Sequence, residues 1–155
     1  MITSKIKRKS TNLNKLKKKI KALSNKKIKS GLFADQGNHP TAGIPYTDLA
    51  YLHHFGTDTL PPRDIRYDAL DELKAYNFKP LLNKYFYKNL PLDSVMDTIA
   101  FRAEDISQSL FGVPSINNPD NSDWWASQKE VGNAPLLQYG YLRDAWNSRV
   151  VNVGD

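Results

Sequence analysis

The sequence predicts an α+β fold in which a small antiparallel sheet packs against two longer helices, with a basic N-terminal helix and a long loop. Two segments have the composition of strands, 26–34 (KKIKSGLFA) and 149–153 (RVVNV). Two others repeat apolar residues at spacings of three and four, as helices with one buried face do. An apolar helix face needs a covering layer, so these segments together favour an α+β arrangement. At 155 residues, the chain is expected to form a single domain, 1–155.

The N-terminal region is strongly basic. Residues 1–34 hold twelve Lys or Arg and no Asp or Glu, while residues 35–155 hold the other ten basic and all sixteen acidic residues, which gives net charges of +12 and −6. Residues 1–12 are expected to be a flexible basic arm. Asn12 or Asn14 can cap a helix that runs to Asn25. Its apolar face is predicted to hold Leu13, Leu16, Ile20 and Leu23.

A loop over residues 35–45 is expected to lead into a short helix, 48–55, with Thr47 as its N-cap and Gly56 at its C-terminal end. Two prolines keep residues 57–63 out of a helix, because proline lacks the N–H donor and fixes φ. The predicted buried face of the short helix is Leu49, Leu52 and Phe55.

Residues 64–89 are expected to be helical in large part, with an interruption at Pro80 that separates two helical pieces. The most regular apolar repeat runs from Leu92 to Leu110 and predicts a long helix that ends at Gly112. Residues 113–135 are expected to be a long loop, and residues 140–146 a helical turn. At least one further strand is expected within 35–47 or 113–139.

No catalytic or metal-binding motif is recognisable. His53 and His54 are adjacent, so on a helix their side chains point about 100° apart and do not form an i, i+4 metal-binding pair. His39 has no ligand spacing to either of them. The chain has no Cys, and no apolar run is long enough to span a membrane. We therefore expect a protein without cofactor, metal, membrane contact or enzymatic activity. A hydrolase with a His/Asp site is the enzyme alternative.

The adjacent tryptophans, Trp124 and Trp125, lie in the polar stretch 113–135. Exposed tryptophans are frequent anchors of protein interfaces, so both are candidate subunit contacts, unless the loop folds back and buries them.

The lysine-rich segment has three interpretations, namely a solvated arm, a DNA-contacting arm or a segment that orders against an acidic neighbour. The candidate DNA or acidic-partner contacts are Lys5, Lys7, Arg8, Lys9, Lys15, Lys18 and Lys19.

Two segments, 49–63 (LAYLHHFGTDTLPPR) and 134–150 (APLLQYGYLRDAWNSRV), resemble segments found in one phage protein family. The first resembles the helix, Phe-Gly-Thr and Pro-x-Arg segment of tail-completion and neck proteins of tailed bacteriophages, including the Mu-like virion-morphogenesis group. The second resembles the closing motif of the same family. The matching residues are Phe55, Gly56, Thr57, Pro61, Pro62 and Arg63, then Pro135, Leu136, Leu137, Gly140, Leu142 and Arg143. Asp64-Ile65 replaces the family's Pro-Phe, and Tyr139 and Ala145 replace its Thr and Ser.

This resemblance implies a structural virion protein made in the host cytoplasm. Such a protein assembles as a homo-oligomeric ring, expected to be hexameric, at the head–tail junction around the DNA channel. Its neighbours would be head-completion and tail-terminator or tail-tube proteins, with genomic DNA in the channel. Arg63 and Arg143 are the residues of these blocks that could pair with an acidic neighbouring subunit. The alternative is a small non-specific DNA-binding protein that uses its Lys-rich arm.

Overall fold

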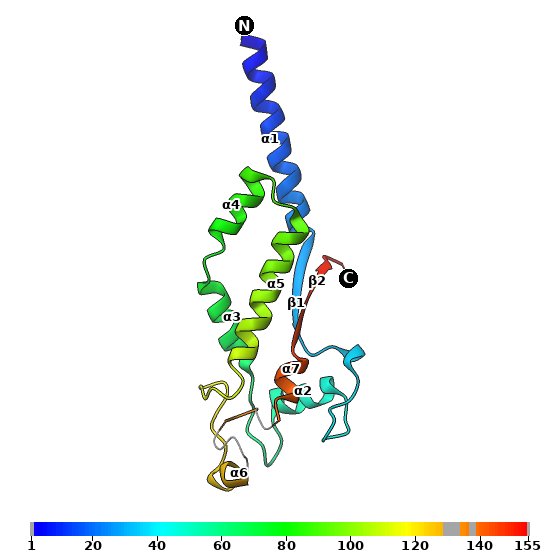
Figure 1. Cartoon of the computed structure of the whole chain (residues 1–155), viewed down its shortest axis with the longest axis vertical. Helices are drawn as coiled ribbons and strands as arrows, with labels where there is room; N and C mark the ends of the chain where they lie inside the picture. The colour runs from blue at the N-terminus through cyan, green and yellow to red at the C-terminus, as the bar shows by residue number, and fades with distance from the viewer. Residues whose placement is uncertain (1, 129–133, 137–138, 155) are drawn as a thin grey trace. The chain divides into compact units, whose positions relative to one another are not determined.

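The computed structural model describes residues 2–128, 134–136 and 139–154, and for residues 2–11 it describes the backbone alone. The protein has an α+β fold with a two-stranded antiparallel sheet, which confirms the predicted class. The sheet pairs β1 (Lys26–Gly31) with β2 (Asn147–Asn152), from opposite ends of the chain (Figure 1).

The chain divides into two compact units. Unit 1 comprises Met1–Lys29, Asn77–Ala100 and Arg149–Asp155, and unit 2 comprises Ser30–Tyr76 and Phe101–Ser148. The sheet and the long helix α5 (Leu92–Ser109) each contribute residues to both units. The prediction of a single domain therefore stays a prediction.

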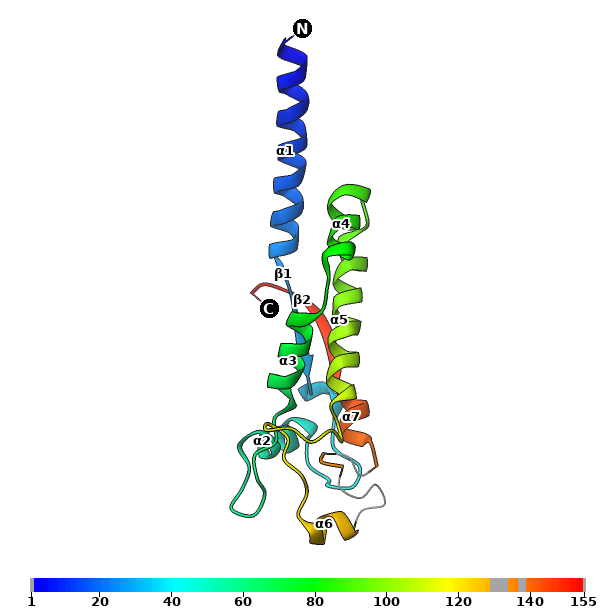
Figure 2. The ribbon, with the colours of Figure 1, turned by 90° about the vertical axis from the view of Figure 1, so that its left-hand side faces the viewer.

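Unit 1 is built from α1 (Ile2–Ser24), α4 (Lys79–Lys88), the first half of α5 and the paired strand ends. Its buried residues are Tyr85, Val95, Met96 and Ala100. The Val153 N–H donates to the Asn25 carbonyl at 2.8 Å, which holds the chain end beside the start of β1. The N-terminal half of α1 extends beyond α4 in two perpendicular views (Figures 1 and 2).

Helix α1 begins at Ile2, so the segment predicted to be a flexible arm is helical. No Gly or Pro occurs before Gly31, and the straight-chain lysines favour a helix, so no residue forces the helix to begin as late as Asn12. The predicted division of 64–89 into two helical pieces agrees with α3 (Ile65–Ala75) and α4, which are separate helices. Pro80 lies in the first turn of α4, where a missing N–H has no cost, so the break lies just before it.

The apolar core of unit 2 receives residues from α2 (Tyr46–Phe55), α3 and α7 (Tyr141–Ala145), and from the residues that directly follow α5. The short 3₁₀ turn η1 (Ala34–Gln36) contacts α2. The core residues are Tyr46, Ile65, Phe111, Leu142 and Trp146, with Leu32, Leu49, Leu110, Leu136 and Ala145 packed against them.

Helix α2 ends at Gly56 as predicted, but its other end and its buried face differ from the prediction. It begins at Tyr46 with Pro45, not Thr47, as the N-cap, and the Pro45 carbonyl accepts the first backbone hydrogen bonds. Tyr46 enters the core, which turns Leu52 and Phe55 toward solvent. Leu49 remains partly buried against the core.

The predicted long loop 113–135 contains a helix, α6 (Asp123–Gln128), which carries both tryptophans. The bounds of both strands also differ from the predicted ones. Strand β1 ends at Gly31 rather than Ala34, and β2 begins at Asn147 rather than Arg149. A further strand is predicted within 35–47 or 113–139. In residues 35–47 the structure has an isolated antiparallel bridge between Asn38 and Pro45. Part of 113–139 lies outside the described residues.

Gly56 is expected to tolerate no side chain. Its φ of 71° is a conformation that L-residues avoid, and an added Cβ would lie 2.6 Å from the Leu60 carbonyl oxygen and 2.8 Å from the Pro62 nitrogen. Gly37 has a similar backbone conformation, with φ 77°, but open space around its Cβ position. We expect Gly56→Ala to destabilise by about 1–3 kcal/mol more than Gly37→Ala in urea unfolding. Equal losses would show that the turn after α2 opens to admit a methyl group.

Candidate functional site

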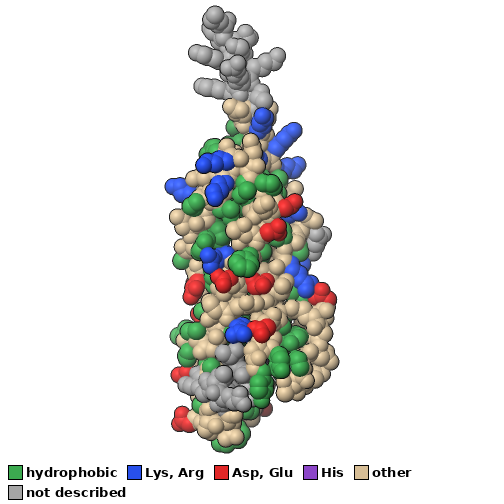
Figure 3. Space-filling model, in the orientation of Figure 1, with side chains coloured by type: hydrophobic (Ala, Val, Ile, Leu, Met, Phe, Trp, Pro, Cys, Tyr) green, Lys and Arg blue, Asp and Glu red, His purple; other side chains and the backbone are tan. Residues whose placement is uncertain are grey.

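The charge of the chain divides between the two units. Unit 1 holds 16 basic and 3 acidic residues, and unit 2 holds 6 basic and 13 acidic residues, for net charges of +13 and −7. Lysines and arginines gather over α1 and α4 on the face drawn in Figure 3. The two units of one chain therefore carry opposite net charges.

The apolar stripe of α1 lacks full cover. Leu13 is 52% exposed, and Leu16 and Ile20 are also exposed. Lys15, Lys17 and Lys18 are exposed as well, and none of them forms an ion pair within the described part of the chain. The helix therefore presents both an apolar stripe and exposed cations. The side chains of Lys5, Lys7, Arg8 and Lys9 lie outside the described residues.

Lys19 corrects one sequence-based prediction, because its ammonium group is engaged within unit 1. It donates to the carbonyl oxygens of Tyr85 at 2.6 Å and Phe86 at 3.1 Å, and to Asn89 Oδ1 at 3.1 Å. In return, the Tyr85 hydroxyl donates to the Lys19 carbonyl at 3.0 Å. A cation at the last carbonyls of α4 satisfies groups that the helix leaves unpaired. Lys19 therefore fastens α1 to α4 and is not a free contact for DNA.

Replacement of Lys19 and of its neighbour Lys18 separates these two roles. We expect Lys19→Ala to lower the free energy of unfolding by about 1–2 kcal/mol, because the α4 carbonyls lose a charged donor. Lys18→Ala is expected to change it by less than about 0.5 kcal/mol, since Lys18 is exposed. Thermal and urea unfolding measure both. A Lys19 variant as stable as the Lys18 variant would contradict this capping role.

Arg63, a predicted subunit contact, is buried inside unit 2. Its Nε donates to the Pro119 carbonyl at 3.1 Å, and its Nη2 donates to the Asp120 carbonyl at 3.1 Å and to Asn121 Oδ1 at 3.4 Å. Burial lowers the pKa of the guanidinium from its ordinary value. Because its donors point to loop carbonyls of the same chain, Arg63 holds the 113–122 segment rather than a neighbouring subunit.

A second anchor of the same segment is Asp68 on α3. Its carboxylate accepts hydrogen bonds from the Ser115 hydroxyl and from the Asn117 amide, the latter at 2.6 Å. Asn118 is fully buried, and its amide donates to the Val113 carbonyl at 2.9 Å. The segment that leads to α6 is therefore held by polar side chains on two sides.

The two tryptophans are exposed on α6, with Trp124 at 66% and Trp125 at 43%, and their rings meet edge to face at 5.2 Å. Trp125 also lines a cavity of about 540 Å³ together with Tyr139 and Tyr141. The tryptophans are thus not buried by their own loop. Their predicted role as subunit contacts stays a prediction. Other residues that line this cavity are His39, Leu49, Leu60, Arg63, Leu136 and Leu142.

Arg143, the other predicted interface arginine, lies on α7. Its Nε contacts the neighbouring Asp144 carboxylate at 2.8 Å, and both side chains are well exposed. An exposed pair of this kind contributes little to stability and leaves the guanidinium open to exchange partners.

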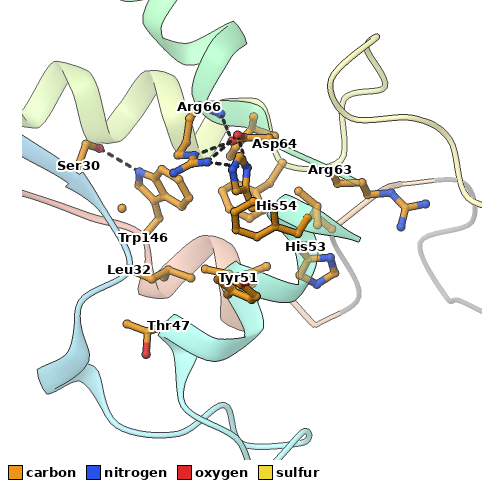
Figure 4. A pocket seen from close by; sticks show the side chains of 17 residues that line it. Ser30, Leu32, Thr47, Tyr51, His53, His54, Arg63, Asp64, Arg66 and Trp146 are labelled. Atoms are coloured by element: carbon orange, nitrogen blue, oxygen red, sulfur yellow. Dashed lines mark hydrogen bonds and ion pairs between the residues drawn. The ribbon is translucent and has the colours of Figure 1, made fainter. Parts of the chain in front are cut away.

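A polar cluster lies at a second cavity of unit 2, of about 440 Å³, and joins His54, Asp64 and Arg66 (Figure 4). Arg66 binds the Asp64 carboxylate through two nitrogens, each at 2.7 Å. His54 Nδ1 lies 2.6 Å from Asp64 Oδ2 and 2.6 Å from Arg66 Nη2. A protonated Nδ1 donates to Asp64, whereas an unprotonated Nδ1 accepts from Arg66. Arg63 points away from this group, toward the loop after α5.

This cluster orders the start of α3, because Asp64 is its N-cap and accepts from the Arg66 backbone N–H at 3.0 Å. Burial acts to raise the pKa of Asp64, but the hydrogen bonds and charge of Arg66, with the charge of His54, lower it overall. The enzyme alternative, a His/Asp site, stays a prediction that a loss of turnover in His54→Ala would support.

The lowered pKa of Asp64 gives stability an acid dependence with a definite sign. The ionised Asp64 carboxylate contributes to the free energy of unfolding above the unfolded-state pKa of about 3.9. This contribution is lost as the pH falls through the lower folded-state pKa. Asp64→Asn keeps the cap but removes this titration, so its stability is expected to vary less below about pH 4. Urea unfolding at several pH values measures this pH dependence of stability. The control is Asp71→Asn, at an exposed position. An unchanged acid dependence in Asp64→Asn would contradict the assignment.

Within the described part of the chain, no three His, Cys, Asp or Glu side chains are grouped so that they could hold a metal ion. Among the same residues, no helix combines the length and apolar character needed to cross a bilayer. The predicted match at Leu137 lies outside the described residues.

Sequence reasoning missed the positioning roles of three residues, which are Lys19, Asp64 and Asp68. Asp64 carried a local signal, since it directly precedes an apolar-periodic stretch, where helix caps occur. The partners of Lys19 and Asp68 lie far along the chain, at 66 or more and 47 or more residues, so no spacing pattern could indicate them.

The chain matches none of the protein-family models, curated proteins or solved structures with which it was compared.

Proposed function

We propose that this chain is a structural subunit of a tailed-bacteriophage virion, which assembles with copies of itself as a ring at the head–tail junction. The observation that carries the proposal is the division of charge between the two units, +13 and −7, with exposed apolar residues on each. A ring forms from heterologous contacts, in which unlike surfaces of neighbouring copies meet. Each copy offers two unlike surfaces.

The resemblance to tail-completion and neck proteins gains support from where its two blocks lie. Segment 49–63 forms most of α2 and the turn after it, and segment 134–150 includes α7 and the start of β2. Leu49 of the first block and Leu136 and Leu142 of the second belong to one core and line one cavity. The two blocks thus act as one packed structure, as parts of a shared family motif would.

The proposed partners follow from this function. Copies of the chain would form the ring, expected to be hexameric, in contact with head-completion and tail-terminator or tail-tube proteins around the DNA channel. Mass spectrometry of purified particles, together with sedimentation of the isolated chain, tests the proposal. We expect the chain to be a component of the particle. A chain that is monomeric alone and absent from particles would contradict it.

A second candidate function is non-specific DNA binding, which the exposed Lys15, Lys17 and Lys18 favour. If these lysines bind phosphates, neutralising all three should reduce the salt dependence of DNA affinity, by a slope of about 0.9 for each phosphate that is no longer bound. The control is the same change at Lys79, Lys84 and Lys88 of α4. An unchanged salt slope would remove this candidate.

A further inference from the structure

We propose that α1 of one copy docks its apolar stripe onto an aromatic face of unit 2 in a second copy. The apolar stripe is Leu13, Leu16 and Ile20. The aromatic face is Trp124, Trp125, Tyr139 and Tyr141, with the cavity of about 540 Å³ that the last three residues line. This inference rests on the proposed function, because it assigns the contact between ring subunits.

The stripe has the form of a groove-binding ligand. Its three residues follow at spacings of three and four, so they share one helix face, and all three are exposed. An amphipathic helix recognises a partner by laying such anchors, at i, i+3 and i+7, into an apolar groove. Lys19, next to Ile20, joins α1 to α4, so the helix that carries the stripe is anchored to unit 1 before it docks. Binding then requires little ordering of the helix.

The aromatic face has the form of a receptor. Its four rings are all more than two-fifths exposed, and the Tyr139 and Tyr141 rings lie 5.9 Å apart beside the cavity. Trp and Tyr are enriched among the few residues that contribute most of the energy in protein interfaces. Leu49, Leu60 and Leu136 line the recess and give it an apolar wall.

Charge selects a second copy as the occupant. Asp123 directly precedes Trp124 in the sequence and Asp120 lies four residues before it, and both are exposed. The docking helix carries the exposed Lys15, Lys17 and Lys18 beside its stripe. The unit that bears the face has a net charge of −7, and the unit that bears the helix has +13. DNA, itself a polyanion, would be repelled from the acidic face but attracted to α1 alone. An amphipathic cationic helix offers apolar anchors for the recess and cations for the acidic residues of the same unit, and every copy of this chain has one.

Charge reversal in the full-length chain tests the docking. Variant A carries Lys15→Glu and Lys18→Glu, and variant B carries Asp120→Lys and Asp123→Lys. Each alone places like charges at the contact, so self-association should weaken by about tenfold or more. In a mixture, the helix of A meets the face of B with both charges reversed, and the helix of B meets the face of A with wild-type charges, so the two variants should bind each other with near wild-type affinity. Analytical ultracentrifugation with one labelled variant measures this.

Matched controls carry the same charge changes elsewhere in the same units, namely Lys79→Glu with Lys84→Glu on α4, and Asp71→Lys with Glu72→Lys on α3. They should associate as the wild type does. Circular dichroism of each variant verifies the fold. A photo-crosslinker at position 16 provides an independent readout, and in a mixture of isotope-labelled and unlabelled chains it should link mainly between copies, to the peptide that contains Trp124 and Trp125.

Each other result would overturn the docking. If A alone and B alone each self-associate like the wild type, the contact lies elsewhere. If the control variants weaken self-association as much as A and B do, association depends on net charge alone. If A loses DNA binding but not self-association, α1 faces nucleic acid. If position 16 links only within its own chain, the occupant is not a second copy. In these cases a chain still found in particles leaves the proposed virion function standing, whereas its absence from particles removes both.

Discussion

Replacement of Trp146 by alanine is expected to lower the free energy of unfolding by about 3–5 kcal/mol, the largest loss from any single side chain considered. Trp146 is 8% exposed at the centre of the unit 2 core, where its ring meets Phe111 edge to face at 5.7 Å. Its Nε1 donates to Ser30 Oγ at 3.0 Å, so the substitution leaves a cavity and also removes a hydrogen bond. Urea unfolding followed by circular dichroism measures the loss.

The matched control is Trp125→Ala, which deletes the same side chain from a 43%-exposed position. We expect a cost of less than about 1 kcal/mol there, because less apolar surface is removed from a buried environment. Trp125→Ala should weaken self-association. A Trp146→Phe variant that folds should self-associate as the wild type does. Equal destabilisation by the two alanine variants would contradict the assignment of Trp146 to the core and of Trp125 to a surface.

Replacement of Arg63 by alanine is expected to cost about 2–3 kcal/mol and to release the segment that leads to α6. The buried guanidinium is the shared donor to the Pro119 and Asp120 carbonyls, so its loss removes the charged hydrogen bonds that hold them. Hydrogen exchange should accelerate over residues 115–123, beyond the increase that the loss of global stability produces. The aromatic face would then be held less firmly, and self-association should weaken.

Two further variants, at Arg63 and at Arg143, serve as comparisons for Arg63→Ala. Arg63→Lys keeps the positive charge but loses the planar fork of donors, so an intermediate loss is expected. Arg143→Ala removes the same side chain from an exposed ion pair and should change stability by less than about 0.5 kcal/mol. Unchanged exchange over 115–123 in Arg63→Ala would show that Asp68 alone suffices to hold the segment.

The parts of the fold that can be predicted from sequence are those with strong local signals. The apolar repeat from Leu92 predicts α5, and Gly56 marks the end of α2, because both depend on residues close together in the chain. The predicted division of 64–89 into two helices agrees with α3 and α4, but the exact position of the break is not predictable, since a proline in the first turn of a helix and one that ends a helix look alike in the sequence. The predicted face of α2 is wrong because Tyr46, not Leu52 or Phe55, is the residue that the core accepts.

The candidate site is predictable only in part. The exposure of Trp124 and Trp125 agrees with the expectation of a surface anchor, although their partner stays a prediction. Arg63 and Lys19 look like free cations in the sequence because their partners are carbonyl oxygens, which carry no signature there and lie more than 50 residues away. The division of charge by structural unit is visible in the sequence only as a basic N-terminus, because unit 1 also draws α4 from the middle of the chain.

The central claim is that the two oppositely charged units of neighbouring copies bind each other. Sedimentation velocity of the full-length chain over a series of salt concentrations tests it most directly. We expect species heavier than the 17.6 kDa chain at low salt, which dissociate as salt screens the charges. A single 17.6 kDa species at every salt concentration, at the highest protein concentration that stays in solution, would contradict the claim.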